Sequence, residues 1–158
     1  MNSRYASLAV FLLLVVFAAY FSGSFEAGEW YHTMYKPEWT PPAWVFGPVW
    51  AALYLLMALA MWNVWITGHE NANGALAWWV LQLAFNAAWS WLFFGLERTG
   101  WAMLELLVLI ALVIFCIRVF AGISRRAALM MTPYVLWLGF AWLLNFSIWR
   151  MNGGSFGF

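Results

Sequence analysis

Long stretches of apolar residues alternate with short polar segments along this chain of 158 residues. A helix that crosses the hydrocarbon core of a bilayer needs about 20 consecutive, mostly apolar residues. Five stretches meet this requirement, which predicts an all-α integral membrane protein built as a five-transmembrane-helix bundle. The predicted spans cover approximately residues 5–25, 43–66, 75–96, 101–121 and 127–149, within a single membrane domain of residues 1–158.

Composition supports a membrane protein, because 66% of the residues are apolar and 8% are charged, whereas a soluble domain is about half apolar and a quarter charged. Two charged residues within the predicted spans, Glu105 and Arg118, lie near the two ends of the fourth span. From there their long side chains can reach the headgroups. A net charge of +1 offers no basic patch for nucleic acid. Cys116 has no second cysteine to pair with, and no metal-ligand spacing exists, so no metal site is predicted.

Polar side chains interrupt the third span at a helical spacing. Gln82, Asn86 and Ser90 stand at i, i+4 and i+8 and therefore share one helix face. The same spacing joins residues on the fifth and second spans: Tyr134, Trp137, Ala141 and Asn145, and Trp50, Tyr54, Met57 and Met61. Two interpretations stay open. The polar groups form hydrogen bonds between helices, worth about 0.6 kcal/mol each on average, or they orient a ligand in a cavity with aromatic walls.

Tryptophan positions bear on this choice. Trp137 and Trp142 lie near the middle of their span, where a buried indole N–H requires a partner, and this position favours the cavity. Other tryptophans fall near predicted span ends, where the headgroup region suits an indole ring: Trp44, Trp62, Trp65, Trp78, Trp79, Trp101 and Trp149.

The loop of residues 26–42 contains Pro37, Pro41 and Pro42. Proline fixes φ and pushes the preceding residue away from helix, so we expect an extended and stiff connection, with Thr40 as a capping candidate for the second span. Loops of this length are commonly functional. We interpret the segment as a lid that presents aromatic rings to a cavity: Trp30, Tyr31 and Trp39.

Three segments together resemble the signature of the TspO/MBR family, the tryptophan-rich sensory proteins related to the mitochondrial translocator protein, once called the peripheral benzodiazepine receptor. The first is WYHTMYKPEWTPPAWVFGPVWAALYLLMALA, in the loop and the second span. The others are QLAFNAAWSWLFFG in the third span and PYVLWLGFAWLLNFSIWRMN in the fifth. Three ordered motifs at matching spacing are specific, and the similarity covers essentially the whole chain.

The resemblance implies a five-helix, usually dimeric membrane protein whose cavity under the first loop accepts porphyrins, such as protoporphyrin IX and haem-type tetrapyrroles, as ligands. It implies that no cofactor is required. It also places the chain in a membrane, which by analogy with bacterial relatives is the bacterial cell membrane. The positions that match the family motifs, together with Trp39 of the lid, are the predicted ligand-binding residues: Tyr31, Trp39, Pro41, Trp50, Gln82, Asn86, Trp89, Phe93, Trp137, Ala141 and Asn145.

Three functions follow as hypotheses. The first is a binding protein for porphyrins and related flat hydrophobic molecules, with a regulatory, sensing or transport role. The second is an enzyme, because Trp50 and Trp137 match tryptophans tied in some bacterial relatives to light-dependent porphyrin breakdown, although the sequence supplies no nucleophile, base pair or cofactor motif. The third is a lipid or sterol carrier; here Phe146 and Trp149 stand where the proposed sterol motif needs a tyrosine.

We expect a homodimer. Its formation in a membrane requires close helix packing, which small residues spaced four apart allow. Two such pairs are available: Ala19 with Gly23, and Ala84 with Ala88.

Overall fold

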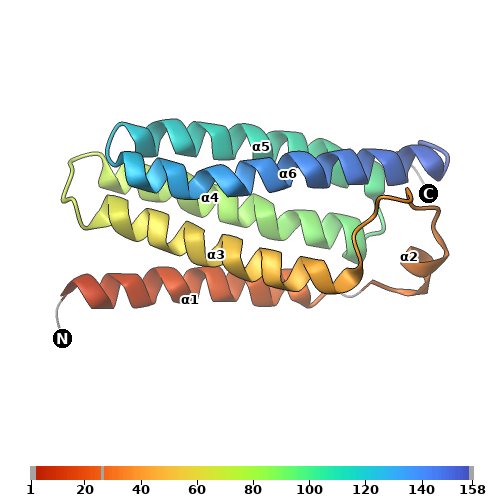
Figure 1. Ribbon diagram of the computed structural model, residues 1–158, viewed down its shortest axis with the longest axis horizontal. Coiled ribbons are helices and arrows are strands. Elements are labelled where there is room, and N and C mark those ends of the chain that lie inside the picture. Colours follow the sequence, from red (N-terminus) through yellow and green to blue (C-terminus); the bar gives the residue numbers. More distant parts are fainter. Residues whose placement is uncertain (1–2, 26, 157–158) are drawn as a thin grey trace.

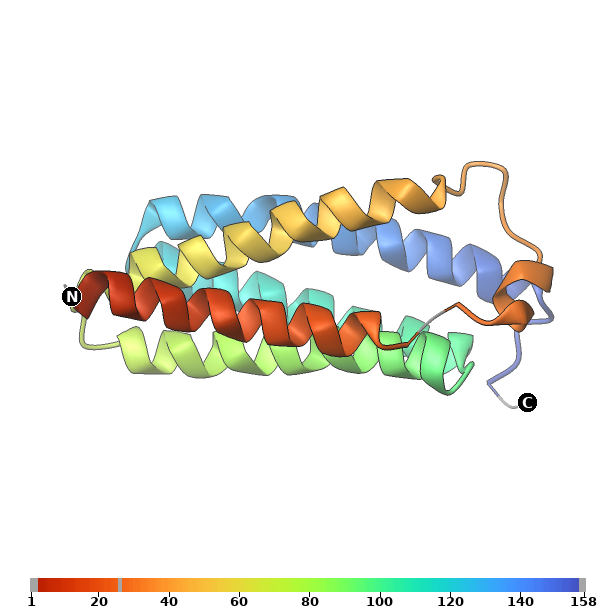
Figure 2. The ribbon, with the colours of Figure 1, turned by 90° about the horizontal axis from the view of Figure 1, so that it is seen from below.

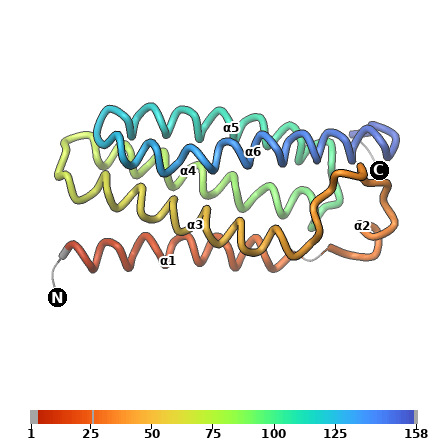
Figure 3. The backbone as a smooth tube through the Cα atoms, viewed as in Figure 1, coloured from red at the N-terminus to blue at the C-terminus, as the bar shows by residue number. Residues whose placement is uncertain are grey.

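A computed structural model describes residues 3–25 and 27–156, and over these residues long helices pack side by side (Figure 1). The long helices are α1 (Ser3–Gly23), α3 (Ala43–Trp65), α4 (Ala72–Ser90), α5 (Thr99–Ala121) and α6 (Arg125–Met151). A short helix, α2 (Glu29–Thr33), lies in the loop between α1 and α3, and a π-helical turn, η1 (Trp91–Gly95), extends α4. The chain runs up and down the bundle, so that its two ends lie at opposite ends of the molecule (Figure 3).

Four helices in the described part of the chain are long and apolar enough to cross a membrane: Arg4–Gly23, Ala43–Trp65, Thr99–Ala121 and Arg125–Met151. Their boundaries differ by at most two residues from the predicted spans 5–25, 43–66, 101–121 and 127–149. The protein is therefore an all-α, multi-pass integral membrane protein. The predicted span at 75–96 corresponds to α4 and η1, and α4 is less apolar because its buried face includes Gln82, Asn86 and Ser90. Its crossing of the membrane stays a prediction.

The larger cluster of buried hydrophobic residues extends to the end of the bundle where α1 begins. Trp79 of α4 is fully buried there, with its ring centroid 5.6 Å from that of Phe11 and its Nε1–H donating to the Met57 carbonyl at 3.1 Å. The expectation that Trp79 lies at the headgroup level is therefore wrong. Trp62 Nε1–H donates to the Arg4 carbonyl at 2.9 Å and ties α1 to α3 at this end.

The two charged residues of α5 differ in their surroundings. Arg118 is exposed, which fits the expectation that it reaches the headgroups. Both carboxylate oxygens of Glu105 are buried, and neither has a hydrogen-bond partner among the described residues. The prediction that Glu105 reaches the headgroups is wrong, because it stands on the flank of α5 next to the buried residues Ala102 and Leu109, at helical spacings of three and four.

The loop between α1 and α3 is only partly extended. Its first half contains α2, and the backbone is extended on both sides of this helix, at Gly28 with φ −68° and ψ 177° and at Met34 with φ −65° and ψ 145°. All three loop prolines follow α2, so their restriction of the backbone leaves this helical turn free to form. The Thr40 hydroxyl donates to the Pro37 carbonyl at 2.7 Å. It therefore closes a turn within the loop and does not cap α3, whose N-cap position is Pro42.

Gly100 permits a close approach between α5 and the segment after α6. A Cβ atom there would lie 2.8 Å from Phe156 Cδ1 and 2.9 Å from Trp149 Nε1. We expect Gly100→Ala to lower stability by about 1 kcal/mol and to expose residues 152–156 to hydrogen exchange, because the Trp149 Nε1–H bond to the Ser155 carbonyl is displaced.

Gly139 provides the matched control. It lies in α6, and a Cβ atom there meets no heavy atom of the described chain within 4 Å. Gly139→Ala should raise the thermal midpoint, since alanine is favoured over glycine inside a helix by about 1 kcal/mol. Equal midpoints for the two variants would contradict the close packing at Gly100.

Candidate ligand-binding site

A cavity of about 720 Å³ lies at the end of the bundle that α2 and its loop cover. α1 and α3 diverge toward this end (Figure 2), and side chains of α1, α3, α4, η1, α5, α6 and the loop line the cavity. Nine of the eleven predicted ligand-binding residues are among the lining residues: Tyr31, Pro41, Trp50, Asn86, Trp89, Phe93, Trp137, Ala141 and Asn145. That they bind a ligand stays a prediction.

The loop segment over the cavity, residues 27–42, is called the lid below. Its α2 rests on η1 through aromatic contacts, with ring centroids 5.9 Å apart for Trp30 and Phe93 and 5.5 Å apart for Tyr31 and Phe94. Burial raises the pKa of the Tyr31 phenol above its ordinary value, so this group stays neutral at physiological pH. Lys36 Nζ lies 4.2 Å from the centroid of the Tyr31 ring, a cation–π geometry.

Asn152 fastens the lid to the end of α6. Its Nδ2–H donates to the Tyr35 carbonyl at 2.9 Å, and its Oδ1 accepts from the Tyr35 N–H at 3.1 Å. These two bonds join residues 117 positions apart in sequence. Sequence reasoning missed Asn152, because the residue follows the last predicted span beside two glycines and nothing local indicates its partner.

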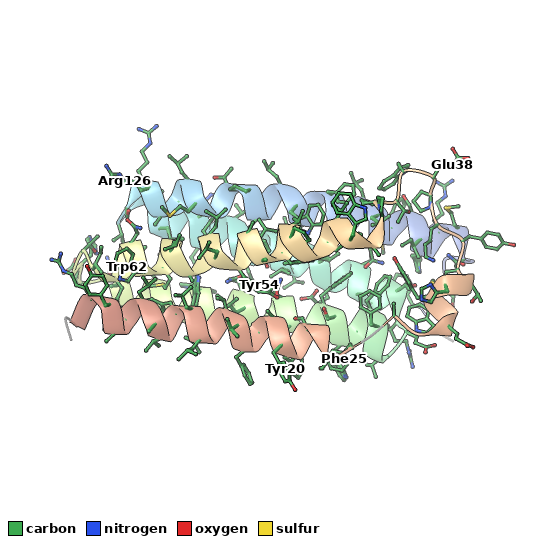
Figure 4. All side chains as sticks on the ribbon, turned by 60° about the horizontal axis from the view of Figure 1, so that its bottom comes forward. Tyr20, Phe25, Glu38, Tyr54, Trp62 and Arg126 are labelled. Carbon is green, nitrogen blue, oxygen red and sulfur yellow. The ribbon has the colours of Figure 1, made fainter. Side chains whose placement is uncertain are left out.

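A hydrogen-bonded triad forms the floor of the cavity. Tyr54 O–H of α3 donates to Asn86 Oδ1 of α4 at 2.6 Å, and Asn86 Nδ2–H donates to the Tyr134 hydroxyl of α6 at 2.9 Å. Figure 4 places Tyr54 inside the bundle, midway along its length. Trp50 lies against both phenols, with ring centroids 5.6 Å from Tyr54 and 6.2 Å from Tyr134. Asn86 thus both lines the cavity and holds three helices together.

The side-chain amide of Asn145 also joins separate segments of the bundle, near η1. Asn145 Oδ1 accepts from Trp89 Nε1–H at 3.2 Å, and its Nδ2–H donates to the Thr99 carbonyl at 2.9 Å. The Trp89 ring stacks on Phe93 with centroids 5.1 Å apart. A π-helical turn shifts the side chains that follow it around the helix axis and is frequent at functional sites. Here the turn contains Phe93, which is buried and lines the cavity.

Trp137 supplies a hydrogen-bond donor without a partner. Its ring lies 5.8 Å from Phe46 and 5.2 Å from Phe140, centroid to centroid. Its buried Nε1–H has no acceptor within the described residues, and Trp137 lines the cavity. A buried indole N–H usually finds a partner, so a ligand acceptor in this cavity would complete it.

Three residues that the sequence associated with the cavity lie outside the set that lines it in the described structure. Gln82 is fully buried one turn from Asn86, and neither atom of its amide finds a partner in residues 3–25 and 27–156. Trp39 is half exposed and packs against Phe140 at 5.9 Å. Trp142 stacks on Phe146 at 5.5 Å. For Gln82 and Trp142, helix rotation and tilt set by the neighbouring helices decide which side chains face the cavity, whereas Trp39 lies in the loop.

The prolines of the lid lead to a kinetic prediction. Pro41 lines the cavity and Pro42 immediately precedes α3. Replacing both by alanine should increase the dissociation rate of a bound porphyrin by about 3- to 10-fold, because a more flexible lid opens more often and loses preorganisation. Stopped-flow displacement in one lipid composition measures this rate.

Pro133→Ala is the control, since Pro133 is exposed within α6, away from the lid. A dissociation rate equal to that of the parent protein in the Pro41→Ala, Pro42→Ala double variant would mean that the segment acts only as a connection.

Comparison with known proteins agrees with this architecture. The TspO/MBR family matches residues 8–150 of the chain. The chain is 38% identical to Protein CrtK of Rhodobacter capsulatus, over 90% of this chain and 96% of the relative. It is 39% identical to the human Translocator protein, over 82% of this chain and 78% of the relative. It is 35% identical to the Tryptophan-rich sensory protein of Cereibacter sphaeroides, over 96% and 95%.

Proposed function

Because the chain belongs to the TspO/MBR family, we propose that its cavity binds flat hydrophobic tetrapyrroles, such as protoporphyrin IX and haem-type porphyrins, in a regulatory, sensing or transport role. The observation that carries this proposal is the cavity of about 720 Å³ with indole rings from three helices, Trp50, Trp89 and Trp137. Small-molecule pockets have volumes of about 300–1,000 Å³ and combine apolar walls with a few oriented polar groups.

The polar groups of the cavity suit such a ligand. Trp137 Nε1–H is an unused donor within the described structure, and Lys36 is the one fixed charge among the described lining residues. A porphyrin with acidic side chains would place its macrocycle between the aromatic walls and its carboxylates toward Lys36 at the rim. No cofactor is required for binding of this kind.

Intrinsic fluorescence tests the proposal. Titration of the protein in lipid with protoporphyrin IX should quench tryptophan emission strongly, since Trp50, Trp89 and Trp137 would lie against the macrocycle. Free tryptophan at the same absorbance supplies the inner-filter control. Quenching no greater than that control would overturn the proposed ligand.

The enzymatic hypothesis makes a separate prediction. Trp50 and Trp137 both line the cavity, and we expect Trp50→Phe or Trp137→Phe to keep measurable porphyrin binding but to slow the loss of porphyrin under illumination, because phenylalanine keeps a ring and lacks the oxidisable indole. Trp142→Phe is the matched control, since Trp142 is also in mid-helix and packs on Phe146. Photochemical loss at the parent rate in both cavity variants would end the enzymatic hypothesis.

We also propose that α4 crosses the membrane as the fifth span. α3 ends and α5 begins at opposite ends of the bundle (Figure 1). If α3 and α5 both cross the membrane, the chain between them must cross it too, and α4 with η1 is the segment that does so. Its polar face turns inward, where Asn86 is paired with α3 and α6, and polar side chains in membrane helices face the interior of a bundle in this way.

A homodimer in a bacterial cell membrane completes the proposal. Of the two predicted small-residue pairs, Ala19 and Gly23 line the cavity, whereas Ala84 is exposed and Ala88 half-buried on α4. The second pair is the better placed for contact with another copy. A lipid or sterol carrier would use the same cavity, and competition between a sterol and porphyrin measures that alternative.

A further inference from the structure

A groove of about 390 Å³ lies at the end of the bundle opposite to the lid. It runs between the first turns of α4 and the last turns of α5, which meet at this end in Figure 1. In the described chain, the residues that line the groove and those that line the ligand cavity form two separate sets. The groove is therefore a feature of its own, away from the lid and the cavity.

Two side chains supply hydrogen-bond donors at the groove. Arg118 of α5 and His69, in the turn before α4, both line it and are exposed. The His69 Nδ1 accepts from the Asn71 N–H at 3.2 Å, so the neutral imidazole has its proton on Nε2, which is then a donor. A guanidinium and an imidazole N–H together suit the oxygens of a phosphate group.

Small residues keep the groove open. Gly74 and Ala75 of α4 and Gly122, next to the end of α5, are among its lining residues. A Cβ atom built on Gly74 would meet no heavy atom of the described chain within 4 Å. The lack of a side chain at Gly74 therefore leaves space for a ligand.

An exposed apolar surface continues from the groove toward the middle of the bundle. Trp78 lines the groove, and its ring packs edge-on against that of Phe115 with centroids 4.6 Å apart. The two side chains are 38% and 42% exposed, and Val108, seven residues before Phe115 on the same helix face, is exposed too. Since α5 is apolar enough to cross a membrane, this surface lies among lipid chains and the groove lies near the headgroups.

Charge is distributed unequally between the two ends of the bundle. The end with the groove has four arginines and, among the residues that the structure describes, one acidic residue: Arg4, Arg118, Arg125, Arg126 and Glu70. Basic and acidic residues balance at the lid end over the same described ranges: Glu29, Lys36, Glu38, Glu97, Arg98 and Arg150. Figure 4 shows Arg126 and Glu38 at opposite ends. The excess positive charge attracts anions to the end with the groove.

We propose that the groove between α4 and α5 binds an anionic phospholipid, such as phosphatidylglycerol, with its phosphate at Arg118 and His69 and its acyl chains against Trp78 and Phe115. Basic pockets between transmembrane helices bind anionic headgroups in this way. A free phosphate ion would use the two donors but leave the exposed rings uncovered. A zwitterionic lipid would bring a quaternary ammonium group to an end of the bundle that is already positive, and it therefore binds more weakly.

Binding of radiolabelled phosphatidylglycerol to the immobilised parent protein in detergent micelles tests the proposal without a variant. We expect an affinity about fivefold higher than for phosphatidylcholine with the same acyl chains, because one basic residue near an anionic group contributes about this factor. Inorganic phosphate should displace the lipid no better than sodium chloride of the same ionic strength does. Equal affinities for the two lipids, or specific displacement by inorganic phosphate, would overturn the proposed lipid site.

Charge substitutions test the position of the headgroup. Arg118→Gln should weaken phosphatidylglycerol binding by about fivefold, and Arg118→Lys should bind more tightly than Arg118→Gln because it keeps the charge. Arg126→Gln is the matched control, since Arg126 is an exposed arginine at the same end outside the described groove lining. Equal weakening by Arg118→Gln and Arg126→Gln would mean that the lipid responds to the overall charge of this end, and the groove would be excluded.

A steric substitution tests the groove without a change in charge. Gly74→Leu should weaken phosphatidylglycerol binding by about tenfold, because its side chain and the headgroup would occupy the same space. Asn73→Leu is the control, since Asn73 is the exposed neighbour on α4 outside the described groove lining. Parent-like affinity in Gly74→Leu, or the same loss in Asn73→Leu, would contradict binding in the groove.

Discussion

Ala141→Phe is expected to reduce porphyrin affinity by about 100-fold, which corresponds to roughly 3 kcal/mol. Ala141 lines the cavity between Trp137 and Asn145, each one helical turn away on α6, and both also line it. A phenyl ring at this position would occupy the space where a flat ligand stacks on Trp137. The bundle itself should fold normally, because the ring enters a volume that is already empty of protein.

Leu143→Phe is the matched control, since Leu143 is exposed on the same helix. Titrations by tryptophan quenching in the same lipid give the three affinities. Parent-like affinity in Ala141→Phe would show that the ligand binds elsewhere, and a loss in both variants would point to a general effect on α6.

Asn86→Leu is expected to lower the free energy of unfolding by about 2 kcal/mol, because each buried polar group that loses its partner costs about 1–3 kcal/mol. The substitution removes the partner of both Tyr54 and Tyr134, which are 8% and 0% exposed. This cost exceeds the average of about 0.6 kcal/mol for one hydrogen bond between membrane helices, since one amide serves two buried hydroxyls. Unfolding by a denaturing detergent in mixed micelles provides the measurement.

Two further variants check the cause. Asn63→Leu is a control on α3, because the Asn63 Nδ2–H donates to the Leu59 carbonyl within its own helix and not to a neighbouring helix of the described chain. Adding Tyr54→Phe and Tyr134→Phe to Asn86→Leu should restore part of the lost stability, since the unpaired hydroxyls are then gone. If the triple variant is less stable than Asn86→Leu alone, the loss arises from packing and the triad is not its source.

Each structural prediction that the structure confirmed depended on residues close together in the sequence. Span boundaries agree with the helices within two residues for the four most apolar segments, because bilayer thickness sets helix length. Of the four residues that helical spacing grouped on one face of the fifth span, Trp137, Ala141 and Asn145 line the cavity, whereas Tyr134 is buried beneath it and bonds to Asn86. The prolines correctly indicated extended backbone near residue 42, where φ is −55° and ψ is 144°.

Residues that belong to the same sequence motif differ in whether they line the cavity in the folded structure. Asn86 and Gln82 share a face of α4, yet Asn86 lines the cavity while Gln82 is buried below it. Likewise, Trp137 faces the cavity and Trp142 packs on Phe146. A periodic pattern identifies the buried face of a helix, but it contains no information on how far along that face the neighbouring helix stays in contact.

The sequence by itself therefore determined that this chain is a helical membrane protein of the TspO/MBR family with an aromatic, proline-rich segment between its first two spans. Only the tertiary structure decided that α1 and α3 diverge, that the resulting space is a cavity, and that Asn152 holds the lid at Tyr35. The physical reason is that helix length and amphipathic face follow from neighbouring residues, whereas helix divergence results from packing between side chains far apart in the sequence, such as Trp62 against Arg4 at one end and small residues at the other.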